Sequence, residues 1–151
     1  MALKHTDFST YSAEDIVRHL DLAPHPEGGH FRQTWIAEGE GRSAGTCIYF
    51  LLAKEECSHW HKVDATEIWH YYAGAPLVLS MSETDAGPAR DHLLGPALFD
   101  GQAPQIIVPP HYWQAARSTG DWTLVGCTVS PAFQFEGFDL APSGFDIPRA
   151  D

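Results

Sequence analysis

The sequence lacks the features that mark nucleic-acid-binding, membrane and secreted proteins. Only nine residues are lysine or arginine, against 20 aspartates and glutamates, so the formal net charge is −11. Because phosphate binding needs clustered basic side chains, we expect no nucleic-acid partner. No apolar run approaches the roughly twenty residues of a membrane span, and residues 1–10 hold no apolar stretch of a secretory signal. We therefore predict a cytoplasmic protein with no membrane partner.

Cysteine is also scarce. Cys47, Cys57 and Cys127 are odd in number and have no short spacing, which argues against a disulfide framework or a cysteine-based zinc site. The 151 residues, 44% of them hydrophobic and 19% charged, are typical of one globular domain. The aromatic content of 12% suits a β-rich core or an aromatic-lined pocket.

A short helix is predicted near the start of the chain, within a helical segment 1–24. Ser12 is in place to cap it, Asp15 stands at the capping-box position, and Ile16, Val17 and Leu20 form an apolar stripe. A Pro- and Gly-rich turn follows at residues 25–29. His25 and Glu27 in this turn could line a pocket mouth, but we interpret the segment as a structural turn.

Most of the remaining chain has the patterning of short strands separated by turns. The predicted strands are 30–37, 45–53, 57–62, 66–73, 77–83, 91–94, 105–108, 112–118 and 122–130. We interpret the last two as a hairpin around residues 119–121, and residues 131–151 as an irregular, aromatic-anchored tail. Short strands at such even spacing favour an all-β sandwich or barrel.

The strands 57–62 and 66–73 carry the polar residues of most chemical interest. Alternation places His59 and His61 on one face of the first strand, and Glu67, Trp69 and Tyr71 on one face of the second. If both faces point into the fold, two imidazoles and a carboxylate converge there.

The order His59-x-His61, five residues, Glu67, six residues, Gly74 resembles the first motif of the cupin superfamily, with one extra residue before Glu67. In the second motif, Gln114 stands where a fourth, histidine ligand would be. Residues 25–29, 48–52, 58–70, 113–116 and 125–129 together resemble the cupin-5 (DUF985) family. This resemblance implies a single cupin domain over 1–151: a double-stranded β-helix (jelly-roll) barrel at about 28–130, with a pocket in its mouth. It also implies a homodimer, and a likeness in fold to sugar-nucleotide epimerases and sugar isomerases.

Three interpretations of the polar cluster remain open. In the first, a divalent metal (Fe, Mn, Ni or Zn) is held by four ligands: His59, His61, Glu67 and Gln114. In the second, His61 and Glu67 act as acid and base without a metal, with Tyr71 as a further acid. In both, the residues expected to bind substrate are His59, Trp69, Tyr112, Gln114, Tyr49 and Arg32. In the third, the cluster binds a ligand and does no chemistry.

We therefore expect a cupin that binds a small polar molecule, of sugar or sugar-acid type, and isomerises or epimerises it by acid–base catalysis. The alternatives are a non-catalytic small-molecule binding protein and a metal-dependent oxygenase.

Overall fold

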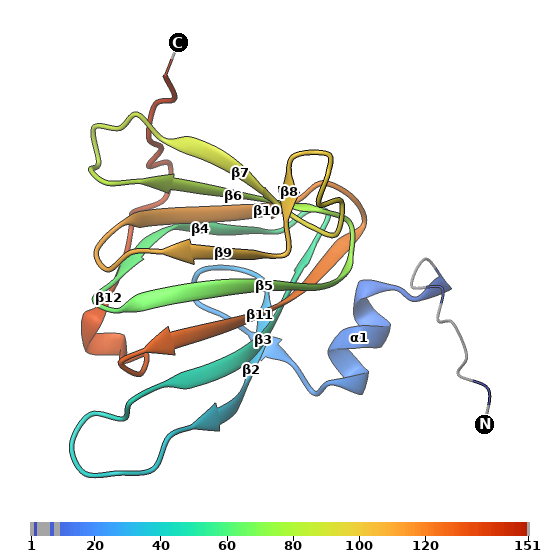
Figure 1. Cartoon of the computed structure of the whole chain (residues 1–151), viewed down its shortest axis with the longest axis horizontal. Coiled ribbons are helices and arrows are strands. Elements are labelled where there is room, and N and C mark those ends of the chain that lie inside the picture. The colour runs from blue at the N-terminus through green and yellow to red at the C-terminus, as the bar shows by residue number, and fades with distance from the viewer. Residues whose placement is uncertain (1, 3–6, 8–9, 151) are drawn as a thin grey trace.

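The computed structural model describes residues 2, 7 and 10–150, so part of the predicted segment 1–24 lies outside the described residues. Two six-stranded sheets face one another, and a short helix lies beside one of them (Figure 1). This is the predicted jelly-roll arrangement. No helix in residues 10–150 is long and apolar enough to cross a membrane.

The first sheet contains, in spatial order, β1 (Ala23–Pro24), β2 (His30–Ile36), β3 (Thr46–Ala53), β11 (Trp122–Ser130), β5 (Thr66–Gly74) and β9 (Gln105–Val108). The second contains β12 (Phe138–Leu140), β4 (Cys57–Val63), β10 (Trp113–Ser118), β6 (Leu77–Ser82), β7 (Arg90–Leu94) and β8 (Gln102–Ala103). All nine strands predicted from the sequence form, and β1, β8 and β12 are additional.

The predicted hairpin around residues 119–121 is wrong. β10 pairs with β4 and β6, whereas β11 pairs with β3 and β5 in the other sheet. The connection therefore crosses between sheets, and a 2.7 Å hydrogen bond joins the hydroxyls of Ser118 and Thr123 on its two sides. The tail is not wholly irregular either, because it contains β12 and the 3-10 turn η2 (Phe135–Gly137).

The main core fills the space between the sheets. Its buried members are Phe50, Leu52, Trp69, Leu77, Leu79, Leu94, Val108, Ala116, Val125 and Cys127. Alternation explains this set, since inward residues recur at every second position of each strand.

The helix α1 (Ala13–His19) covers the outer face of the first sheet. The Ser12 hydroxyl accepts from the Asp15 amide and the Asp15 carboxylate accepts from the Ser12 amide, both at 3.1 Å, which confirms the predicted capping box. Ile16 and Val17 pack against a second cluster that includes Leu51 and Trp122. Leu51 is therefore buried on the face of β3 opposite to the main core.

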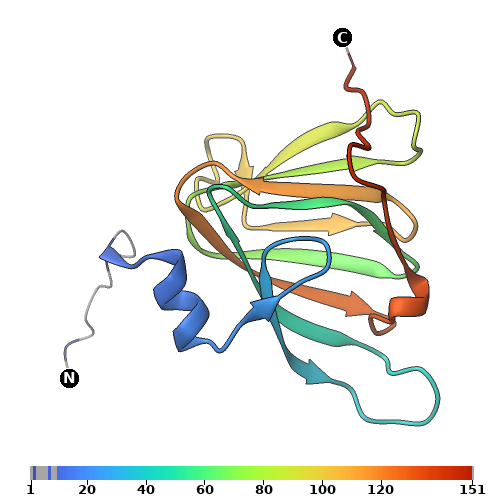
Figure 2. The same ribbon diagram turned by 180° about the vertical axis from the view of Figure 1, so that it is seen from behind.

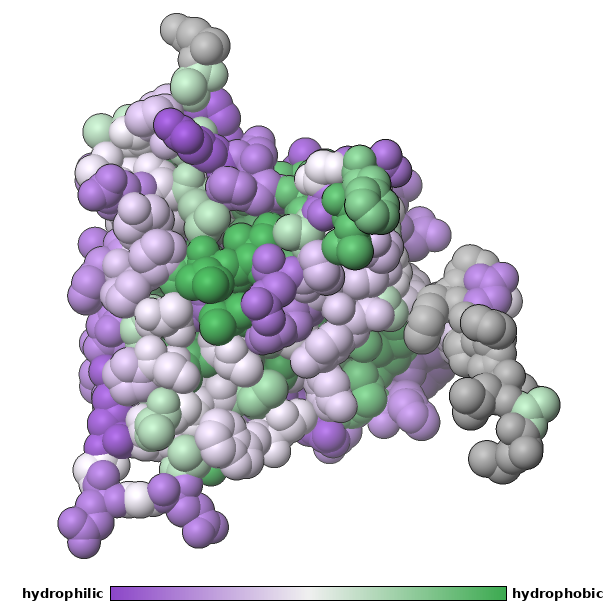
Figure 3. All heavy atoms as spheres, viewed as in Figure 1, coloured by the Kyte–Doolittle hydropathy of each residue, from purple (hydrophilic) through white to green (hydrophobic). Residues whose placement is uncertain are grey.

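Some apolar side chains remain on the surface. Figure 3 shows hydrophobic surface near the middle of the face seen in Figure 1, in the region of β9, and again at the β7–β8 connection. Ile107 in β9, and Leu98 and Phe99 between β7 and β8, are exposed large hydrophobic residues.

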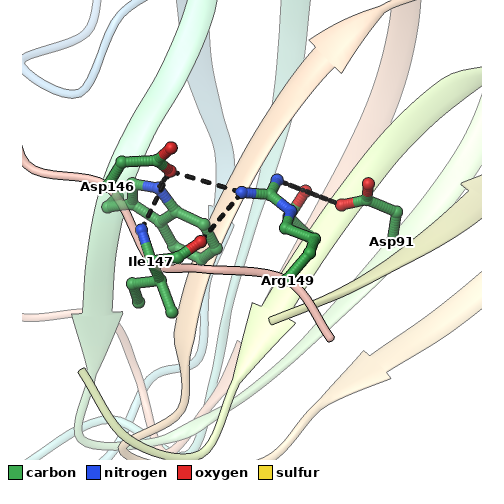
Figure 4. Close-up of polar contacts among 6 residues, drawn as sticks. Asp91, Asp146, Ile147 and Arg149 are labelled. Carbon is green, nitrogen blue, oxygen red and sulfur yellow. Dashed lines mark hydrogen bonds and ion pairs between the residues drawn. The ribbon is translucent and has the colours of Figure 1, made fainter. Parts of the chain in front are cut away.

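The C-terminal tail closes the outer face of the second sheet over Trp60. The Trp60 indole donates to Asp146 Oδ1 at 2.9 Å. Arg149 lies between Asp146 and Asp91, at 3.3 and 3.1 Å from their carboxylates, and also donates to the Ile147 carbonyl at 3.0 Å (Figure 4). The Ile147 side chain is fully buried beside Trp60.

We predict that Ile147→Ala lowers the free energy of unfolding by about 2–4 kcal/mol, the usual cost of such a cavity in a core. Urea unfolding followed by tryptophan fluorescence measures the effect. Leu98→Ala is the control, because Leu98 is 60% exposed and its truncation should cost less than about 0.5 kcal/mol. Equal, small effects of both variants would show that the tail does not dock as described.

Candidate functional site

A β-bulge in β4 decides which side chains enter the fold. Gln114 pairs with His61 and Ala116 with Ser58, so three steps along β4 match two along β10. The extra residue reverses the alternation, and both Ser58 and His61 face inward. The prediction that His59 and His61 share a face is therefore wrong. His59 lies on the outer side, with Nε2 at 3.0 Å from the carbonyl of Pro142.

The carboxylate beside His61 is that of Glu27, from the turn between β1 and β2. Glu27 Oε2 is 2.9 Å from His61 Nδ1, and its Oε1 is 3.3 Å from His25 Nδ1. The Ser58 hydroxyl also donates to Glu27 Oε2. The side chains of Glu27 and His61 are only 9% and 2% exposed, so this is a buried ion pair.

Gly28 lets the turn approach β4 closely enough to deliver Glu27. Its φ is +113°, and a Cβ there would lie 2.0 Å from the Cys57 carbonyl oxygen. The His59 amide also donates to the Glu27 carbonyl at 2.8 Å. We interpreted this segment as a structural turn, and that interpretation missed its contribution to the site. The glycine pair beside Glu27 was the signal in the sequence.

The ion pair sets the protonation of His61, and burial sets that of His25. Burial acts to lower the pKa of His61, but the charge and hydrogen bond of Glu27 outweigh it and raise this pKa to about 9. Burial acts in the opposite sense on Glu27, yet His61 brings the pKa of this carboxyl below its ordinary value. Burial dominates at His25 and lowers its pKa. At neutral pH, His61 is therefore a cation and His25 is neutral.

Glu67 in β5 has the most unusual surroundings. It is 7% exposed, and its Oε1 is buried without a hydrogen-bond partner among the described residues. Burial raises the pKa of Glu67 to about 7; the charge of His61 opposes the rise and that of Glu27 adds to it. Glu67 can therefore both take and give a proton near neutral pH.

These groups surround a cavity of about 80 Å³ inside the barrel. Its polar lining comes mainly from His25, Glu27, His61 and Glu67, and its aromatic lining from Phe31, Phe133, Phe135 and Phe138. The last three belong to the C-terminal tail, which we did not assign to the site. Ligand sites usually measure about 300–1,000 Å³, so the cavity can enclose a very small molecule or the reactive end of a larger one.

Several predicted site residues do not line the cavity, although Gln114 and Trp69 lie close enough to Glu67 for hydrogen bonds from both to act to lower its pKa. Trp69 donates from its indole to Gln114 Oε1 at 2.8 Å, and both are buried core residues that do not line the cavity. The Tyr71 hydroxyl donates to the Gly74 carbonyl at 2.6 Å. Tyr112 lines a different cavity.

Two more predicted substrate-binding residues lie on the outer face of the first sheet. The Arg32 guanidinium is 5.8 Å from the centre of the Tyr49 ring. These two residues pair across β2 and β3, on the face covered by α1, away from the cavity.

The predicted metal ligands do not form a metal site. Within the part of the chain that the structure describes, no three His, Cys, Asp or Glu residues are placed to hold an ion together. His59 lies on the outer side of β4, so it cannot share an ion with His61 and Glu67 inside the barrel. The set His59, His61, Glu67 and Gln114 therefore does not fit a divalent metal.

Known families and structures resemble the chain over most of its length. The Cupin_5 model, described as cupin superfamily (DUF985), matches residues 14–141. A protein from Shewanella oneidensis is 36% identical, with a TM-score of 0.81 over 87% of this chain and 85% of that one. A hypothetical protein from Leishmania major is 28% identical, with a TM-score of 0.82 over 89% and 90%.

More distant likeness concerns the fold alone. Oxalate decarboxylase from Bacillus subtilis is 9% identical, with a TM-score of 0.60 over 78% of this chain and 29% of that one. The comparison with curated proteins finds no match.

We predict that the His61 ring titrates near pH 9 and that Glu27→Gln lowers its pKa. The reason is that Glu27 is the largest influence opposing burial at His61, and the variant removes its charge. Histidine side-chain NMR over a pH series measures both values. Glu56→Gln is the matched control, since Glu56 lies 3.4 Å from His30 instead.

The same titration determines how stability depends on pH. Between 6.5 and about 9, the folded protein holds a proton on His61 that the unfolded chain has lost. The free energy of unfolding should therefore fall as pH rises through this window, by at most about 3 kcal/mol. A flat wild-type profile in urea unfolding, or an unchanged His61 pKa in Glu27→Gln, would contradict this account of the ion pair.

Proposed function

The chain belongs to the Cupin_5 (DUF985) family of the cupin superfamily, and on this basis we propose that its cavity binds a small sugar-type hydroxycarbonyl compound and isomerises it by acid–base catalysis. Glu67 is the observation that carries the proposal. Its carboxyl is buried at the cavity, has an unpartnered oxygen within the described structure, and has a pKa raised to about 7 by burial. Such a group is suited to proton transfer at neutral pH.

The proposed reaction moves one proton between two carbons. The Glu67 carboxylate takes a proton from the carbon beside the carbonyl, and the C–H electron pair becomes the double bond of an enediolate. The His61 cation, in the same cavity, stabilises the negative charge that develops on the oxygen. Glu67 then returns its proton to the neighbouring carbon. At the same time the hydroxyl proton on that carbon's oxygen passes to the former carbonyl oxygen, so that the aldehyde and ketone positions exchange. Return of the proton to the opposite face of the same carbon would give an epimer.

The charges of the cavity favour an uncharged substrate. Glu27 and ionised Glu67 would repel an anion, and the single cation His61 is already paired with Glu27. We therefore favour a neutral sugar over a sugar acid. A cavity of about 80 Å³ encloses only the reactive end, and the rest would lie against Phe135, which is 59% exposed.

The small cavity also favours a second candidate function, namely binding without catalysis. His61 and Glu27 satisfy one another in the absence of any ligand. A ligand could then be held by Glu67 alone, with the ion pair serving as a fixed polar wall.

We predict that the protein exchanges the proton beside the carbonyl of a small aldose or ketose with solvent. The measurement is proton NMR in D2O with glyceraldehyde, dihydroxyacetone and erythrulose. Glu67→Gln should slow exchange by at least about 100-fold, because the general base is lost. Glu38→Gln, in the exposed loop after β2, is the control and should leave the rate unchanged. Binding without exchange would support the second candidate, and undiminished exchange in Glu67→Gln would refute the role of Glu67.

A further inference from the structure

A second cavity, of about 350 Å³, lies between the β6–β7 hairpin and Tyr112. Its lining includes Met81, Glu83, Pro88, Arg90 and His92, and none of its residues lines the Glu67 cavity. Its volume falls within the range of about 300–1,000 Å³ that is usual for sites of small organic ligands. The hairpin loop and the β9–β10 turn lie at the same end of the molecule in both ribbon views (Figures 1 and 2).

Strand register shows that Arg90 and His92 belong to the inner face of their sheet. Leu94 pairs with Leu77 and His92 with Leu79, and these three leucines are fully buried between the sheets. Arg90 pairs with Met81, two residues further along both strands. Because alternate residues of a strand share a face, Arg90 and His92 continue the apolar row of Leu94 toward the cavity.

The Ser82 and Thr84 hydroxyls in the lining of this cavity donate to backbone carbonyls, whereas its larger donors are without partners in the described structure. Arg18, Arg42 and Arg149 each lie within 2.7–3.1 Å of a carboxylate oxygen. In contrast, no described residue forms a hydrogen bond or ion pair with the side chains of Arg90 or His92, or with the Tyr112 hydroxyl. The chain has a net charge of −11. An arginine that faces a cavity and forms no ion pair with a carboxylate is therefore suited to bind an anion.

We infer that this second cavity binds a small organic anion carrying a carboxylate or phosphate group. The Arg90 guanidinium donates two parallel N–H bonds to the anion, a geometry that suits both groups. His92 and the Tyr112 hydroxyl supply further donors, and Met81 and Pro88 supply an apolar surface for the organic part. This site does not depend on the function proposed for the Glu67 cavity.

The inner face of the second sheet connects the two cavities. His61 pairs with Gln114, Gln114 with Met81, and Met81 with Arg90, across four adjacent strands. His61 lines the first cavity, Met81 and Arg90 line the second, and Gln114 lies buried between them. Glu83 is the one carboxylate in the lining of the second cavity and should weaken anion binding there.

The test is a titration of the full-length protein with benzoate and with inorganic phosphate, followed by NMR of the His92 ring and the Arg90 side chain. We expect saturable binding in the millimolar range for benzoate. Arg90→Gln should weaken it about tenfold or more, which is the usual loss for a charged hydrogen bond. Glu83→Gln should strengthen it.

Arg117→Gln is the matched control, because Arg117 is an exposed arginine in the outer groove beside Cys57 and should not affect binding. Arg90→Lys keeps the positive charge but loses the two parallel N–H donors of the guanidinium. This variant should bind benzoate more weakly than the wild type. Circular dichroism establishes that each variant folds. Phosphate binding that depends on Arg90 would also support the site and show that the organic part is dispensable.

Either of two results would overturn the inference: no saturable binding of either probe, or binding that Arg90→Gln and Arg117→Gln leave equally strong. Arg90 would then serve only as an inward charge that protects the edge of the sheet from pairing with other chains. Neither result would bear on Glu67, whose proton exchange is measured separately.

Discussion

The buried ion pair between Glu27 and His61 fixes two opposite charges in the barrel cavity, beside which Glu67 takes up and releases its proton. Each partner would be costly to bury alone, and each moves the pKa of the other toward the charged form. With the charges of Glu27 and His61 fixed, Glu67 is left as the carboxyl with a pKa near 7. The surroundings of Glu67 in β5 thus depend in part on the β1–β2 turn that carries Glu27. Gly28 allows this turn to approach β4.

Local patterning predicted the strands well and the site only in part. Alternation accounts for Leu77, Leu79 and Met81 on the core side, because inward residues of a regular strand recur at every second position. Alternation failed at His59, where one bulge residue shifts the phase, and spacing alone cannot show an inserted residue. Glu27 was missed as a site residue because its contact with His61 spans 34 positions of the sequence. The resemblance to cupin-5 was confirmed by the family match, whereas the homodimer and the cytoplasmic location stay predictions.

The two cavities differ in charge, and this difference follows from the strands that line them. The first combines carboxylates from the β1–β2 turn and β5 with one imidazolium. The second has Arg90 and His92 from an edge region of the other sheet. Gln114 lies between them as a neutral amide held by the Trp69 indole. A neutral residue there keeps the positive charge of Arg90 apart from the ion pair of His61.

The sheet order affects how the protein folds during synthesis. β11 lies between β3 and β5, and β10 lies between β4 and β6, yet both are among the last strands to leave the ribosome. Until residues 113–130 emerge, each sheet lacks a central strand, and the neighbouring strands present unpaired amides and carbonyls. The nascent chain therefore cannot build its sheets progressively from the N-terminus. Both sheets must close in one late step, and chains stalled before β10 would expose edges prone to aggregation and recognition by chaperones.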